Sequence, residues 1–124
     1  MTSRAMLTTL AAGRLALGAA LVARPRSQVG AGWVGEDAQR GAAALLLRSV
    51  GARDVALALG TLGAQRTGSP LKPWLLGATL ADAVDLLATF AAGRAIPAKG
   101  RVAIALLAGV AIAQQLALAR SVDA

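Results

Sequence analysis

The sequence contains no histidine, no cysteine and no tyrosine, and only 2% of its 124 residues are aromatic. These absences exclude the serine–histidine–aspartate triad, thiol nucleophiles, disulfides, and zinc or haem sites built on histidine or cysteine. Charged residues are also few, at 15%, whereas soluble domains carry about 25%. A domain this small keeps much of its chain at the surface. The composition therefore indicates a bilayer rather than water as the surroundings of the protein.

Apolar residues are abundant instead, at 56% of the chain, and they gather in four runs. The runs cover residues 6–22, 42–64, 71–92 and 102–119. Each is long enough to cross a bilayer, which takes about 17–25 residues. A soluble four-helix bundle is the main alternative, but residues 103–113 contain no polar side chain and so offer no polar face. The sequence predicts an all-α four-helix transmembrane bundle, with residues 1–124 as a single integral membrane domain.

The net charge of +7 comes from 13 basic and 6 acidic residues, which are scattered singly or in short groups between the apolar runs. Nucleic-acid binding needs basic charge gathered on one face or tail, so we expect no nucleic-acid partner. Arg4 before the first run also fits a signal peptide, but Arg14 interrupts its apolar core, and we expect the run to remain as a helix. The side reached after the first run carries six basic residues and the other side four, which favours a cytoplasmic location for the former.

Six charged residues interrupt the apolar runs, and they are the candidate site of this protein: Arg14, Arg48, Arg53, Asp54, Asp82 and Asp85. An Arg or Asp at the centre of a spanning helix costs about 2.5–3.5 kcal/mol. The eight leucines and valines of the second run favour membrane insertion by only roughly 4 kcal/mol, whereas its three charges oppose insertion by roughly 8 kcal/mol. We therefore expect an intramembrane polar cluster whose members face one another, with Arg53 and Asp82 as the expected pair.

Three interpretations of this cluster are open: an ion-pair network that fixes helix register, a polar site for a ligand, ion or lipid headgroup, and a proton or ion pathway. Asp82 and Asp85 also have the spacing of magnesium-binding carboxylates in membrane enzymes that act on diphosphates. Such sites need more carboxylates than this chain supplies. We expect no catalytic residue, no metal site and no cofactor.

Two further features concern packing. The connection over residues 27–41 is either a short interfacial segment with Trp33 at headgroup depth or an ordinary loop. Ala105, Gly109 and Ala113 recur every four residues, a spacing that allows close helix approach inside the bundle or in a homodimer.

The stretch Gly51-Ala52-Arg53-Asp54 in the second run resembles a group of small four-pass bacterial membrane proteins of unknown function. The segments 23–26, 33–35 and 80–85 are similar to that group as well. The resemblance implies a four-pass fold in the cell membrane and no established activity. We expect a non-enzymatic accessory or scaffolding subunit, or alternatively a small transporter or channel-like protein that uses its intramembrane carboxylates. The lipid bilayer is its expected partner, and a second copy or another membrane protein is open as a further one.

Overall fold

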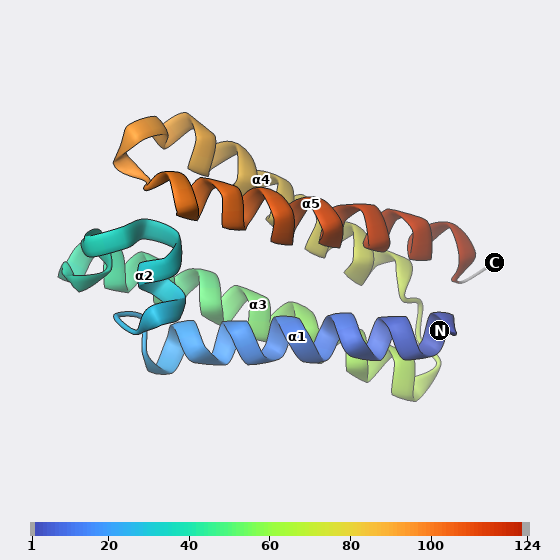
Figure 1. Cartoon of the computed structure of the whole chain (residues 1–124). Helices are drawn as coiled ribbons and strands as arrows, with labels where there is room; N and C mark the ends of the chain where they lie inside the picture. The colour runs from blue at the N-terminus through green and yellow to red at the C-terminus, as the bar shows by residue number, and fades with distance from the viewer. Residues whose placement is uncertain (1, 123–124) are drawn as a thin grey trace.

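The computed structural model describes residues 2–122 and is all-α, as predicted (Figure 1). Four long helices coincide with the four apolar runs to within a few residues at either end. They are α1 (Ser3–Ala23), α3 (Gly41–Thr67), α4 (Lys72–Ala92) and α5 (Ala98–Ser121). A short helix α2 (Gln28–Val34) and a 3-10 turn η1 (Gly35–Gln39) join α1 to α3. A second 3-10 turn, η2 (Gly93–Ala95), lies between α4 and α5.

Three of the long helices are candidate membrane spans by length and composition, namely α1, α4 together with η2, and α5. Their outward faces carry large apolar side chains, among which Leu80, Leu87 and Leu106 are each more than 60% exposed. Large contiguous apolar surface of this kind is rare on proteins surrounded by water and fits contact with lipid. The chain is a small multi-pass membrane protein.

The long helices form two antiparallel pairs, in which α1 packs mainly against α3 and α4 mainly against α5 (Figure 1). The tightest approach within the first pair is at Gly18 and Gly51. A Cβ atom on Gly18 would lie 2.7 Å from the carbonyl oxygen of Gly51, and one on Gly51 would lie 2.5 Å from that of Gly18. Only glycine at both positions permits this distance between the helix backbones.

The expected stripe of small residues on α5 does not form such a contact within the chain. A Cβ atom on Gly109 would meet no atom within 4 Å. Among the described residues, 2–122, no helix packs against the Cβ position of Gly109, although the spacing of the small residues would allow it.

Local sequence explains where the helices begin and end. The Thr2 hydroxyl accepts a hydrogen bond from the Ala5 amide and caps α1. Gly68 ends α3 in the left-handed conformation, with φ of 70°, which glycine adopts without strain. Pro73 lies in the first turn of α4, where its missing N–H has no intrahelical partner to lose.

The connection between α1 and α3 is an ordered cap, so the alternative of an ordinary loop is wrong for α2. The Trp33 indole Nε1 donates a hydrogen bond to Thr89 Oγ1 of α4 at 3.0 Å. The Trp33 carbonyl oxygen lies directly against Gly100 of α5. This cap ties the two helix pairs together at one end of the bundle, which we call the α2 end. The opposite end, where α1 begins, is the N end.

Buried apolar side chains form two small clusters near the two ends of the bundle. Leu7, Leu75, Leu118 and Ala119 join α1, α4 and α5 at the N end. Leu21, Ala38 and Leu47 form the second cluster at the α2 end. The middle of the bundle, between these clusters, is where the charged side chains of α1, α3 and α4 meet.

Candidate functional site

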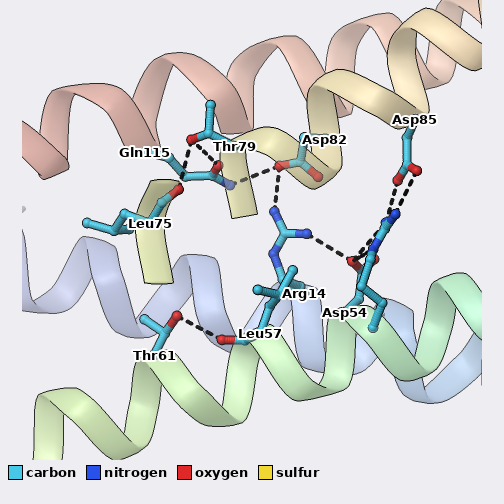
Figure 2. Close-up of polar contacts among 10 residues, drawn as sticks. Arg14, Asp54, Leu57, Thr61, Leu75, Thr79, Asp82, Asp85 and Gln115 are labelled. Carbon is cyan, nitrogen blue, oxygen red and sulfur yellow. Dashed lines mark hydrogen bonds and ion pairs between the residues drawn. The ribbon is translucent and has the colours of Figure 1, made fainter. Parts of the chain in front are cut away.

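Five of the six charged residues singled out in the sequence meet in one network (Figure 2). Arg14 comes from α1, Arg53 and Asp54 from α3, and Asp82 and Asp85 from α4. The network therefore joins the first helix pair to the second.

The guanidinium of Arg14 lies between two helices and contacts a carboxylate on each. Its Nη1 donates to Asp54 Oδ1 at 3.0 Å, and its Nη2 donates to Asp82 Oδ2 at 2.5 Å. The Arg14 side chain is only 12% exposed, and that of Asp82 is 11% exposed. A planar guanidinium has donors on two sides in fixed directions, so Arg14 bridges α3 and α4 with one side chain.

Arg53 makes the second connection between the pairs. Its Nη1 and Nη2 donate to Asp85 Oδ1 and Oδ2 at 2.9 and 2.5 Å, which is the bidentate arrangement of an Arg–carboxylate pair. Its Nη2 also donates to Asp54 Oδ1 at 3.1 Å. The expected Arg53–Asp82 pair is wrong: Arg53 lies against Asp85, and Arg14 takes Asp82. Residues three apart on α4 share a face but differ in depth by about 4.5 Å, and this difference selects the partner.

A glutamine that we did not place in the cluster extends the network to α5. Gln115 Nε2 donates to Asp82 Oδ2 at 3.0 Å, and Thr79 lies with its hydroxyl 2.9 Å from Gln115 Oε1 (Figure 2). Gln115 is only 3% exposed. The available signal was its polarity at the end of an otherwise apolar run, since a buried amide needs a partner.

Arg48 lies outside the network. Its side chain is exposed on α3, and its Nε donates to the carbonyl oxygen of Val22 at the end of α1, at 3.2 Å. This contact satisfies an orphan carbonyl of the last helical turn and places a cation at a helix C-terminus. Arg48 therefore stays near the α2 end.

Without Arg48, two guanidiniums face three carboxylates. Asp54 Oδ1 is shared by Arg14 and Arg53, and Asp82 receives an additional donor from Gln115. Breaking a buried pair by removing one partner typically costs about 3–5 kcal/mol, because the remaining charge has no compensation. The two arginines are thus the scarcer and more constrained members of the network.

The close contact between α1 and α3 at Gly18 and Gly51 determines where the charged residues of these two helices meet. Gly18 lies one turn from Arg14 on α1, and a Cβ atom there would lie 3.1 Å from the Cβ of Asp54. Because the helix backbones approach closely at Gly18 and Gly51, the Asp54 carboxylate lies within reach of Arg14. This pair of glycines could not be predicted, since nothing in the separate apolar runs shows which glycines face each other.

The middle of the bundle holds little free space. A cavity of about 20 Å³ lies beside Arg14, Thr61 and Gln115 and is otherwise lined by apolar side chains. That volume suits a single water molecule. Within residues 2–122, no three acidic side chains converge closely enough to hold a metal ion.

Comparison with known proteins adds no relative. No protein-family model matches the chain, and searches of the curated proteins and of the solved structures find no match.

Proposed function

We propose that this chain is a four-pass protein of the cell membrane whose Arg–Asp network is structural. In this proposal it acts as a non-enzymatic accessory or scaffolding subunit, and the network sets the register of its two helix pairs. The observation that carries the proposal is the position of Arg14, which is paired at the same time with Asp54 of α3 and Asp82 of α4. The motifs shared with small bacterial membrane proteins favour the same fold and location.

The path of the chain supports α3 as the fourth span. Gln65, near the end of α3, donates to the carbonyl oxygen of Arg4 at the start of α1, so α3 ends where α1 begins. Leu75 in the first turns of α4 packs with Leu7 of α1 at this same end. If α1 and α4 both cross the membrane from the N end, the chain must return between them, and α3 is the element that runs back.

The two central charges of α3, Arg53 and Asp54, are compatible with this placement because charges on neighbouring helices compensate them. Arg53 and Asp54 pair with each other and with charges on α1 and α4. A charge that faces a partner inside a bundle avoids most of the cost of exposure to lipid.

The extent of the network favours a structural role over a conducting one. Thr79 and Asp85, its outermost members on α4, are about 9 Å apart along the helix axis, whereas the hydrocarbon core is about 30 Å thick. Apolar clusters close the bundle on either side of it. The polar groups form a bridge across the helices and not a path along them.

The cavity beside Arg14 and Gln115 favours a second candidate, a small transporter or channel-like protein that uses the Asp carboxylates. A site of about 20 Å³ has room for one water. Transport through it would require the helix pairs to separate.

Flux across liposomes distinguishes the two candidates. Purified protein is reconstituted with a pH-sensitive or cation-sensitive dye inside, and an ionophore supplies the positive control. A structural network predicts flux equal to that of empty liposomes, while Asp82→Asn reduces the folded yield. Flux that is above background and is lost in Asp82→Asn protein of normal yield would refute the structural role. For the accessory role, affinity purification from native membranes should recover another membrane protein in fixed ratio.

A further inference from the structure

A second polar region lies at the N end of the bundle, apart from the Arg–Asp network. A cavity of about 510 Å³, open to the outside, is lined by the beginning of α1 and the last turns of α3. Its size falls within the range of small-molecule sites, about 300–1,000 Å³. The residues that line it are of two kinds, cationic or polar at one end and apolar at the other.

Two arginines form the polar end of this cavity. Arg4 of α1 and Arg66 of α3 are both exposed. Neither forms an ion pair with any residue in the described part of the chain, whereas each of the buried arginines of the network does. Two unpaired guanidiniums that border one cavity attract an anion, and they bind phosphate oxygens with charge-assisted hydrogen bonds.

The wall between these arginines is held in place. Gln65 Nε2 donates to the carbonyl oxygen of Arg4 at 3.2 Å, and Thr8 lies with its hydroxyl 3.3 Å from Gln65 Oε1. These contacts join α1 to α3 beside the cavity. The cavity is therefore bordered by fixed helices and not by a loop.

The apolar end of the cavity lies deeper along α3, at Leu59, Leu62 and Gly63. These residues share one face of the helix with Arg66, and Leu59 is about 10 Å from Arg66 along the axis. Since α1 is a candidate span that begins at Ser3, Arg4 lies at the boundary between water and lipid. The arginines are thus at headgroup depth and the leucines at acyl-chain depth.

From this arrangement we infer that the cavity is a binding site for an anionic glycerophospholipid. The headgroup phosphate lies between Arg4 and Arg66, and the upper part of one acyl chain lies along Leu59, Leu62 and Gly63. A headgroup with net negative charge is preferred over a zwitterionic one, because within residues 2–122 no carboxylate pairs with either of the two cations. The inference concerns a different surface from the Arg–Asp network and goes beyond the proposed structural role.

Two sets of variants test the two ends of the site, and each has a matched control. Arg4→Gln with Arg66→Gln removes the cations, while Arg24→Gln with Arg26→Gln removes two exposed arginines near the α2 end and changes the net charge equally. Gly63→Leu fills the apolar end, since a Cβ atom on Gly63 meets nothing within 4 Å, and Gly13→Leu makes the same exchange at an equally open, exposed position of α1. Native mass spectrometry in detergent then measures binding of phosphatidylglycerol and of phosphatidylcholine with the same acyl chains.

We expect wild-type protein to bind phosphatidylglycerol more tightly than phosphatidylcholine. The Arg4/Arg66 double variant should weaken phosphatidylglycerol binding about tenfold or more, because both cations that attract the anionic headgroup are removed. Gly63→Leu should weaken binding of this lipid too, and both controls should bind as wild type does. Equal affinity for the two lipids, or equal loss in a variant and its control, would overturn the inference. Displacement of the lipid by millimolar inorganic phosphate would also overturn it, because a free-phosphate site would not depend on an acyl chain.

Discussion

At the scale of single residues, the two arginines of the network are not equivalent to its three aspartates. Arg14 pairs with two carboxylates, Asp54 and Asp82, which lie on two helices. Arg53 also pairs with two carboxylates, Asp54 and Asp85, so the two arginines share Asp54. If Asp54 is neutralised, two complete pairs remain, Arg14 with Asp82 and Arg53 with Asp85. If Arg14 is neutralised, Asp82 keeps only the amide of Gln115 as a partner.

This asymmetry predicts that Arg14→Gln destabilises the protein more than Asp54→Asn does. We expect Arg14→Gln to lower the free energy of unfolding by about 3–5 kcal/mol, as in other broken buried pairs. Asp54→Asn keeps an oxygen acceptor for both arginines and should cost about 1.5 kcal/mol. Reversible unfolding in mixed micelles measures both values. Equal losses would mean that Asp54 is as indispensable as Arg14.

A double-mutant cycle tests the observed pairing of Arg53. Arg53→Ala leaves the Asp85 carboxylate without its ion-pair partner, and Asp85→Ala leaves Arg53 with Asp54 alone. The double variant removes both members of the pair, so its cost should fall below the sum of the two single costs. The coupling energy should be about 1–3 kcal/mol. The cycle of Arg53→Ala with Asp82→Ala serves as the comparison and should give the smaller coupling. A larger coupling between Arg53 and Asp82 would favour the pairing expected from sequence.

At the scale of helices, the closest packing depends on two glycines in different runs. Gly18 and Gly51 each lie against the backbone of the partner helix, with Cβ positions blocked at 2.7 and 2.5 Å. Gly13 lies on α1 as well, but its Cβ position meets no atom within 4 Å. The same residue type thus has opposite consequences five positions apart on one helix.

Alanine substitutions should separate these two cases. Gly13→Ala should stabilise the protein by up to about 1 kcal/mol, because alanine restricts the unfolded chain and favours helix. Gly18→Ala should instead destabilise it by about 1–3 kcal/mol, since the helices must move apart. The movement would also lengthen the Arg14–Asp54 contact. Thermal unfolding of the two variants side by side is the measurement, and a stabilising Gly18→Ala would contradict the close crossing.

At the scale of the whole molecule, the arrangement places the start of α1, the end of α3, the start of α4 and the end of α5 at the N end (Figure 1). The absence of native cysteine allows single cysteines to be introduced without background labelling.

Four passes predict that cysteines at Ser3, Ser69 and Ser121 react with a membrane-impermeant thiol reagent from one side of the membrane. A cysteine at Gln28 should react from the other side. If Ser69 were labelled from the same side as Gln28, α3 would not cross and the four-pass proposal would be wrong.

The same set of cysteines decides the orientation in intact cells. Six basic residues lie in the connections and the adjoining first turn of α5 at the α2 end, and four lie in the helix ends at the N end. Positively charged connections stay preferentially in the cytoplasm, so we expect the α2 end to be cytoplasmic and both ends of the chain to lie outside. Impermeant reagent added to cells should then label Ser3→Cys and spare Gln28→Cys.

The sequence by itself determined the surroundings of the protein and the elements of its fold. Helix-length apolar runs, with Pro25, Pro70 and Pro97 between them, were sufficient to predict the long helices, because helix length and hydropathy are local properties of a chain. The charge of each run likewise singled out the residues that need partners, since an unpaired charge in lipid is costly wherever the helix lies. Only the tertiary structure decided which partners they find. Arg53 lies against Asp85 instead of Asp82, Arg48 turns to the backbone of α1, and Gln115 completes the network. These outcomes depend on the rotation and depth of each helix, which the Gly18–Gly51 crossing and the α2 cap set through contacts between residues far apart in the chain.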